Sequence, residues 1–445
     1  MLLNSILLNT QKLLYPLYKK SFVLKNIDFL IFLNIIALIL YSTVATSDNI
    51  AIFAIFTIIL TAIKLLSKPN AKLNLVLSEK ILLVYFMIVL ISVAGSSLLV
   101  YSLKGFSKTL VYIAFYASVV EYLKNNKSKI KYIFLALAMA CFGEIFVAIK
   151  QNFLSVSEIS GWQDMSRLNP EQVMTRVYGS LKPYNPNLFG GYLVAILPST
   201  LLLIFLPLLN HHKKTALGGF CIFIASIIAL IMTGCRGAYL GLLVELVLTA
   251  ILTYKFLSPV YKRIFLLFSG ILSSIGAFLM LSAASLRARL FSMFAMRGDS
   301  SNSFRFNVYN SCVDMFKDNW LLGIGVGNQN FREIYGLYMK TGFDALSAYN
   351  IYLETAVESG IFALITFMAF LLLNVFSAFK YIMKYKNVFS LYVLIALVSV
   401  VGLMVHGFVD TVFFRPQIHF VFWLMIAIIR VLSMSEGESY DRSRN

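Results

Sequence analysis

The sequence predicts an all-α membrane protein, a bundle of about twelve transmembrane helices. Of its 445 residues, 59% are hydrophobic and 13% are charged, and the mean hydropathy is +0.81. A water-soluble domain has roughly 45 to 50% apolar and about 25% charged residues. Apolar runs of about 18 to 22 residues recur along the chain, and each is long enough to cross a bilayer as a helix. We therefore expect one integral membrane domain over residues 1–445.

Positive charge follows the loops of this bundle. The formal net charge is +18, and lysine is concentrated in every second loop, as at residues 124–131 and 380–386. This alternation is the positive-inside pattern of membrane proteins, and it differs from the basic footprint of a nucleic-acid-binding protein. We expect a multi-pass protein of the cytoplasmic (inner) membrane, with both termini cytoplasmic. Its predicted partner is the lipid bilayer, not nucleic acid, and the sequence gives no oligomeric state.

With the N-terminus inside, the apolar runs define the spans in chain order. They are Ile27–Ala45, Ile50–Leu66, Ile81–Tyr101, Thr109–Leu123, Tyr132–Ile149, Leu188–Leu209, Ala216–Thr233, Ala238–Phe256, Ile264–Ala284, Ile351–Phe379, Phe389–His406 and Ile418–Leu432. Two polar stretches, residues 151–187 and 285–350, become extracytoplasmic loops within the membrane domain. We expect short surface helices in the second loop. The sequence indicates no internal repeat and no pair of interrupted spans.

The basic residues of the predicted outer loops are mostly arginine. They are Arg167, Arg176, Lys182, Arg236, Arg287, Arg289, Arg297, Arg305, Arg332 and Arg415. Arginine presents a planar fork that binds phosphate or carboxylate through two parallel hydrogen bonds. A solvated charge or a headgroup anchor is the alternative for each residue. That alternative is weaker for Arg236, because TGCRGAYLG is a very short turn between two spans. The pattern predicts an anionic ligand at the outer surface.

A second motif, TRVYGSLKPYNPNLFGGYL, ends a polar stretch just before a span. Asn185 and Asn187 flank a proline there, and this combination caps a helix and fits its first turn. The two glycines that follow allow another helix to approach closely. Helix N-termini favour anions, and Arg176 lies beside this one. Capping alone is the alternative to anion binding by Arg176, Asn185 and Asn187.

The second outer loop contains an amphipathic segment, SFRFNVYNSCVDMF. Phe304, Val308, Cys312 and Met315 recur there at spacings near 3.6. This spacing predicts a short helix on the outer surface, with its apolar side on lipid or on the bundle and Arg305 beside that stripe.

Carboxyl groups also fall within the predicted spans. Glu354 and Glu358 are one helical turn apart and share a face near the outer interface. Glu144 and Glu245 lie at membrane depth, where a carboxyl marks either a functional site or a hydrogen-bonded structural group. No residues have metal-ligand spacing, and we predict neither a metal nor a cofactor.

Together these pieces resemble the O-antigen ligase and polymerase superfamily of membrane proteins. The resemblance covers about residues 170–360, through RVYGSLKPYNPNLFGGYLVAILP, TGCRGAYLG, SFRFNVYNSCVDMFKDNWLLGIGVGNQNF and SAYNIYLETAVESG. The closer branch is that of IctB-type bicarbonate transporters, which the chain resembles through LSAYNIYLETAVESG and HGFVDTVFFRPQIHFVFWLM. The resemblance implies about twelve helices with a large outer loop over a cavity.

The resemblance also implies roles for single residues. In the ligases, outer arginines bind the diphosphate of a polyprenyl-linked glycan, and Arg236 and Arg305 match those positions. A histidine directly before an Asn-x-x-Leu helix start assists the acceptor, and Tyr349 occupies its position here. A phenol with a pKa near 10 is a poor base at neutral pH, whereas imidazole near 6.5 is well placed.

Three functions follow from these patterns. The first is metal-independent glycan transfer or polymerisation from a polyprenyl-diphosphate-linked donor, with an outer carboxyl such as Glu354 or Asp344 as the base. Its candidate catalytic residues are Arg236, Arg305, Tyr349 and Glu354, and its candidate anion-binding residues are Arg176, Asn185, Asn187, Arg236 and Arg305. The second is transport of bicarbonate or another small anion, with Glu144 or Glu245 as a coupling group. The third is non-catalytic binding of a lipid-linked glycan.

Overall fold

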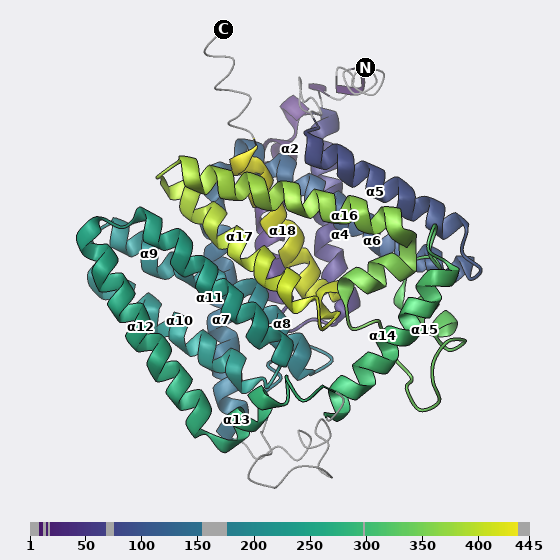
Figure 1. The fold of residues 1–445 in the computed structure, drawn as a ribbon. Helices are drawn as coiled ribbons and strands as arrows, with labels where there is room; N and C mark the ends of the chain where they lie inside the picture. The colour runs from purple at the N-terminus through teal and green to yellow at the C-terminus, as the bar shows by residue number, and fades with distance from the viewer. Residues whose placement is uncertain are drawn as a thin grey trace.

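The fold is a polytopic membrane bundle, as predicted (Figure 1). The computed structural model describes residues 9–11, 15–16, 18–67, 75–153, 176–296 and 299–434. Within these ranges every regular element is a helix, and ten helices are long and apolar enough to cross a membrane. The other two predicted spans are also helical. One is only 15 residues long, and the other is too polar to satisfy the same test.

The N-terminal third of the chain forms the first group of helices. They are α2 (Phe22–Lys25), α3 (Ile27–Tyr41), α4 (Ser47–Ser67), α5 (Leu77–Ala94), α6 (Leu99–Asn125) and α7 (Ile130–Phe153). Helix α6 includes Lys104 and Lys108, where the sequence predicts a loop before a span at Thr109. The backbone of Val326 and Gly327 packs on Gly105 in this part of α6. Lys104 and Lys108 themselves are exposed, so this contact covers only the Gly105 side of the helix.

The rest of the chain forms the second group of helices. They are α8 (Pro186–Ile196), α9 (Leu202–Leu209), α10 (Lys213–Met232), α11 (Arg236–Phe256), α12 (Pro259–Ser282), α13 (Ala284–Phe291), α14 (Ser300–Asp318), α15 (Asn328–Tyr335), α16 (Ile351–Lys384), α17 (Val388–His406) and α18 (Pro416–Ser433). Two predicted spans are interrupted, contrary to expectation. A 3-10 segment, Leu197–Leu201, joins α8 to α9, and Gly360 breaks α16 with a φ of 79°.

The break at Gly360 is closed by the loop between α14 and α15. Three backbone hydrogen bonds join the loop to α16: Ile324 N–H to the Val357 carbonyl at 3.0 Å, Gly325 N–H to Glu358 at 2.9 Å, and Ile361 N–H to Trp320 at 2.9 Å. The Ser92 hydroxyl of α5 also donates to the Glu358 carbonyl, at 2.8 Å. The backbone groups around the break are therefore bonded to protein, as polar groups at membrane depth must be.

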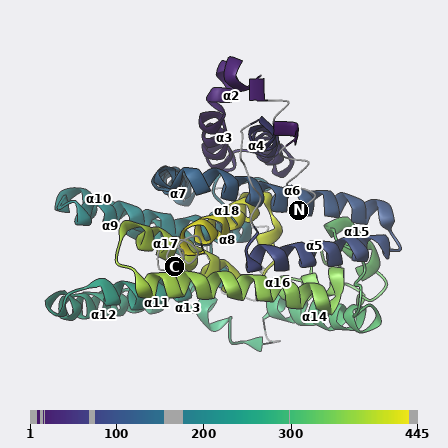
Figure 2. The ribbon, with the colours of Figure 1, turned by 90° about the horizontal axis from the view of Figure 1, so that it is seen from above.

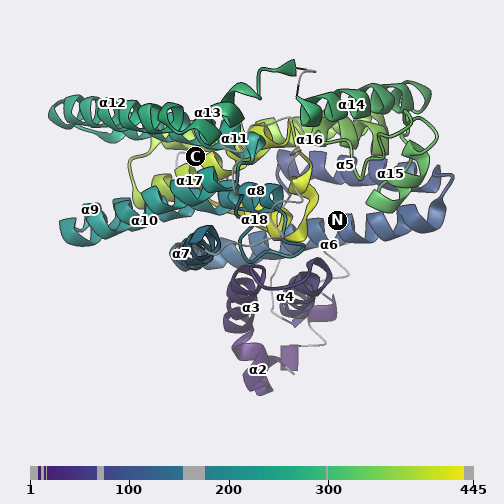
Figure 3. The ribbon, with the colours of Figure 1, turned by 90° about the horizontal axis from the view of Figure 1, so that it is seen from below.

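The flanks of the bundle differ in how they pack. Seen from above and below, α3 and α4 lie on one flank, outside α6 and α7, while α12 lies on the opposite flank (Figures 2 and 3). Helix α12 buries none of its residues. The predicted surface helix is α14, and Val308, Cys312 and Met315 of its apolar stripe are fully buried in a second core with α15 and α16.

Candidate functional site

The turn between α10 and α11 organises three arginines. The carbonyl of Thr233 accepts from Arg176 Nε at 2.8 Å, and the carbonyl of Gly234 accepts from Arg289 Nε at 2.9 Å. Arg236 begins α11 directly after this turn. Gly234 has a φ of 62°, and a Cβ there would lie 3.0–3.3 Å from atoms of the Arg176 side chain. Both backbone conformation and packing therefore require glycine at this position.

Arg236 ties the start of α11 to α13 and α14. Its Nη1 donates to the Ser292 carbonyl at 3.2 Å and to the Ser292 hydroxyl at 3.1 Å. It also forms an ion pair with Asp299 at 2.9 Å. Asp299 caps α14, because its side chain accepts from the N–H of Asn302. One carboxylate thus neutralises Arg236 and fixes the helix that carries Arg305.

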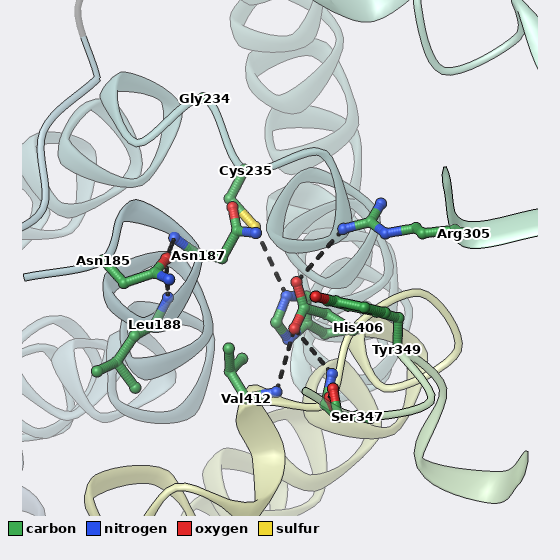
Figure 4. Close-up of polar contacts among 12 residues, drawn as sticks. Asn185, Asn187, Leu188, Gly234, Cys235, Arg305, Ser347, Tyr349, His406 and Val412 are labelled. Carbon is green, nitrogen blue, oxygen red and sulfur yellow. Dashed lines mark hydrogen bonds and ion pairs between the residues drawn. The ribbon is translucent and has the colours of Figure 1, made fainter. Parts of the chain in front are cut away.

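Arg176 is held by the start of α8. Its Nη2 donates to Asn187 Oδ1 at 2.6 Å, and the side chain is buried. Asn185 caps α8 and accepts from the N–H groups of Asn187 and Leu188. Figure 4 shows the Asn185 side chain beside these N–H groups. Because Asn185 already occupies them, any anion contact here falls to the guanidinium of Arg176 and not to the helix N-terminus.

Arg305 of α14 forms the other half of the site. Its Nη2 lies 3.5 Å from Asp410 Oδ2, and its guanidinium lies 5.8 Å from the centre of the Tyr349 ring. Asp410 is buried, and its Oδ1 accepts from the N–H groups of Thr411 and Val412. Arg305 therefore rests between a fixed carboxylate and an aromatic face.

Tyr349 and Glu354 shape the turn before α16. Tyr349 has a φ of 50°, and its carbonyl accepts from the Tyr309 hydroxyl at 3.1 Å. Burial raises the pKa of Tyr349, and the negative charge of Asp410 adds to the effect, so the phenol stays protonated at neutral pH. Glu354 is buried and accepts from the N–H of Ala348 at 2.9 Å. Its carboxylate holds the turn in place.

His406 and Cys235 lie between the two halves of the site. The Cys235 sulfur is 3.6 Å from His406 Nε2, and both residues are buried. Burial opposes ionisation of the Cys235 thiol, but the hydrogen bond with His406 lowers the thiol pKa below its usual value. His406 reaches this place because the end of α17 is bonded to the start of α16, for example through Ile351 N–H to the Gly407 carbonyl at 2.9 Å.

The four arginines form one electrostatic cluster. The charges of Arg289 and Arg305 both act on Arg236, and the charge of Arg176 acts on Arg289. Burial lowers the pKa of Arg176 and of Arg289, and in Arg289 the positive charge of Arg176 adds to it. In the described part of the chain, neither of these two forms an ion pair, whereas Arg236 and Arg305 each have an aspartate. The cluster therefore has an excess of two positive charges.

The other predicted outer basic residues do not share this burial. Lys182, Arg287, Arg332 and Arg415 are exposed, and so is Asp344, one of the two predicted bases. Arg167 and Arg297 lie outside the described residues.

Sequence reasoning gave no role to Asp299, Asp410 or His406. Asp299 could have been found as an N-cap before an amphipathic helix. The other two come from the end of α17 and the loop that follows it, and no local pattern pairs these with a residue of α14 or of the turn before α11.

Fold and site define a multi-pass membrane protein with a cluster of buried and half-buried arginines at one end of the bundle. Residues 221–368, about one third of the chain, match the family model described as O-Antigen ligase. This segment is similar to that family, in agreement with the superfamily that the sequence motifs resemble. It includes Arg236, Arg289 and Arg305, but not Arg176 or Asp410. No curated protein is similar enough to the chain to count as a match.

Proposed function

We propose that the protein transfers a glycan from a polyprenyl-diphosphate-linked donor at the outer face of the cytoplasmic membrane, as a ligase or polymerase. The observation that carries this proposal is the excess of two positive charges in the arginine cluster. Arg176 and Arg289 are tethered through Nε to successive carbonyls and form no ion pair in the described chain. A diphosphate places at least two negative charges on neighbouring oxygens, which suits two such guanidiniums. The family match supports this reaction class.

In this reaction the acceptor hydroxyl attacks the anomeric carbon of the glycan. The new bond joins the acceptor oxygen to that carbon, the carbon–oxygen bond to the diphosphate breaks, and its electron pair leaves with the diphosphate. Arg176 and Arg289 stabilise the charge that develops on the leaving group. Arg236 and Arg305, each paired with an aspartate, position the helices around it.

We assign the acceptor's proton to Asp410. Tyr349 is protonated and has a raised pKa, so it serves as the aromatic face under Arg305 and not as a base. Glu354 accepts from the N–H of Ala348 and, in the described chain, pairs with no arginine of the cluster. Asp410 Oδ1 is used by two N–H groups, whereas Oδ2 has, among the described residues, only the 3.5 Å contact with Arg305. That oxygen can accept a further hydrogen bond, and the proton passes to it.

Two observations favour transfer over small-anion transport. Glu144, one of the predicted coupling groups, accepts hydrogen bonds from both the N–H and the hydroxyl of Ser180, so its carboxylate anchors a loop. The interrupted helix α16 has its break closed by backbone hydrogen bonds, whereas interrupted transporter helices offer these groups to the substrate.

The test uses the purified protein in liposomes that contain a polyprenyl-diphosphate-linked glycan. Transfer to an added acceptor and flux of bicarbonate are measured in the same preparation. We expect transfer without flux, and loss of transfer in Arg176→Ala but not in Lys182→Ala, an exposed basic residue of the same segment. Flux without transfer would make the protein a transporter. Donor binding that depends on Arg176, without any transfer, would make it a glycan-binding protein.

A further inference from the structure

One face of α11 is lined by two glycines and a glutamate. Gly237, Gly241 and Glu245 follow one another at intervals of four residues, so they lie along one side of the helix. A Cβ on Gly237 would be 2.7 Å from His406 Cδ2, and a Cβ on Gly241 would be 3.0 Å from the Gly402 carbonyl. Helix α17 therefore packs directly on this face, with His406 opposite the first glycine.

Glu245 is buried in this interface without a partner. It is 2% exposed, and neither carboxyl oxygen has a hydrogen-bond partner in the described part of the chain. A Cβ on Gly402 would overlap its carboxyl group. An ionised carboxylate without a partner at this depth is strongly unfavourable, whereas the neutral acid leaves only hydrogen bonds unmade. Glu144 is also buried but differs from Glu245, because its carboxyl group accepts two hydrogen bonds from Ser180.

His406 is a second titratable group on the same interface with an unused atom. It is 0% exposed, and its Nδ1 has no hydrogen-bond partner among the described residues. His406 follows Gly402 by one helical turn, about 6 Å along the axis. The charges that act on its ring come from Cys235, Asp410 and Arg305.

In the described part of the chain, Glu245 forms no ion pair. Helix α17 brings Gly402 to it, and helix α8 brings Val194 to the neighbouring Gly241. The interface between α11 and α17 thus contains two titratable groups. One is Glu245, which has no charged partner in the described chain, and the other is His406, which lies beside the arginine cluster.

We propose that Glu245 and His406 form a proton-binding site in the α11–α17 interface. Glu245 keeps its proton at neutral pH, and His406 takes up a proton when an anion occupies the arginine cluster, because the anion offsets the excess positive charge of that cluster. The response of His406 to a bound anion rests on the proposed function, whereas a protonated Glu245 requires no transfer.

The first test is infrared spectroscopy of the purified protein at neutral pH. A protonated carboxyl has a carbonyl stretching band that a carboxylate lacks. We expect Glu245→Gln to remove a band of this kind and Glu144→Gln to leave it unchanged. A spectrum that Glu245→Gln does not alter would overturn the proposal. Glutamine matches the neutral acid in shape, and size-exclusion chromatography checks that the variant folds.

The second test adds inorganic pyrophosphate to the protein in weakly buffered solution with a pH indicator. We expect uptake of about one proton per bound pyrophosphate, lost in His406→Gln but kept in Arg287→Ala. Binding by calorimetry without proton uptake would overturn the role of His406 and leave the proposed function standing. Absence of binding would count against the proposed function, and the infrared result would then decide the state of Glu245.

Discussion

In the half of the arginine cluster built on the turn between α10 and α11, Arg176 and Arg289 are tethered through Nε to backbone carbonyls. In the half built on α14 and the end of α17, Arg305 faces Asp410 and the ring of Tyr349. The first half keeps its positive charge, and the second is neutralised. An arginine held by a carbonyl remains available to an anion, whereas one held by a carboxylate serves mainly to fix the structure. The motif arginines Arg236 and Arg305 are both of the second kind.

The largest effect should come from the neutral half. Asp410→Asn removes the proposed base and leaves Arg305 without its ion pair, so the transfer rate should fall by about 10²- to 10⁴-fold, with donor binding retained. Single-turnover transfer in liposomes measures this. Asp344→Asn, the exposed carboxyl, is the control and should stay near the wild-type rate. A loss in Asp344→Asn alone would move the base to the outer loop.

Removing a charge from the other half should weaken binding. Arg289→Ala takes away a guanidinium that no carboxylate neutralises, and we expect pyrophosphate affinity to fall by roughly 10- to 100-fold, the value of one or two charged hydrogen bonds. Calorimetry at two salt concentrations measures it, because a charge contact weakens with salt. Arg287→Ala, on the same helix but exposed, should bind normally. Equal losses in both variants would mean that only the overall charge matters.

The turn itself can be altered without removing any charge. Gly234→Ala forces a residue with a side chain into a φ of 62° and brings its Cβ against Arg176. We expect a loss of about 1 to 2 kcal/mol in stability and a several-fold weaker affinity for pyrophosphate. Gly218→Ala, in α10 where a Cβ meets nothing within 4 Å, is the matched control. Unchanged affinity in Gly234→Ala would show that the turn does not orient Arg176.

The smallest effect should come from the phenol of Tyr349. Its raised pKa keeps the hydroxyl neutral as pH rises to about 10, so Tyr349→Phe should change the transfer rate by less than about twofold. The pH profile between about 6 and 9 should not move, since no titration of this group falls there. Tyr349→Ala, which removes the face under Arg305, should lower the rate more, by the roughly 0.5 to 1 kcal/mol of a cation–π contact. If the alkaline side of the pH–rate profile shifted in Tyr349→Phe, the phenol of the wild-type protein would have to carry a proton in the reaction.

Much of the fold follows from local patterns. Apolar runs placed the membrane helices, and the stripe from Phe304 to Met315 placed α14, because both signals depend on residues close in sequence. The two interruptions did not follow from local patterns. The break at Gly360, for example, is stabilised by a loop some forty residues earlier and by Ser92 of α5. The sequence predicts a loop at the polar half of α6, because the backbone that packs on Gly105 there comes from distant residues, 326–327.

The candidate site was predictable in kind but not in pairing. The arginine fork and the short turn around Arg236 indicated an anion site, and Asn185 and Asn187 indicated the start of α8. Which arginine would be neutralised depended on Asp299 and Asp410, which lie 63 and 105 residues from their partners. Such ion pairs form only when distant segments pack together in the folded bundle. Sequence motifs therefore pointed to Arg236 and Arg305, which are paired, and not to Arg289, which in the described chain is not.

The closure of the break at Gly360 has a consequence for protein engineering. Residues 320–325 supply hydrogen bonds to the backbone of α16, so this surface loop is a structural part of the membrane helix. A chimera that replaces the loop alone would leave bare amide and carbonyl groups at the membrane border. An exchange of this loop between relatives would therefore have to include the first three turns of α16. The exchanged segment would then contain both loop and membrane helix.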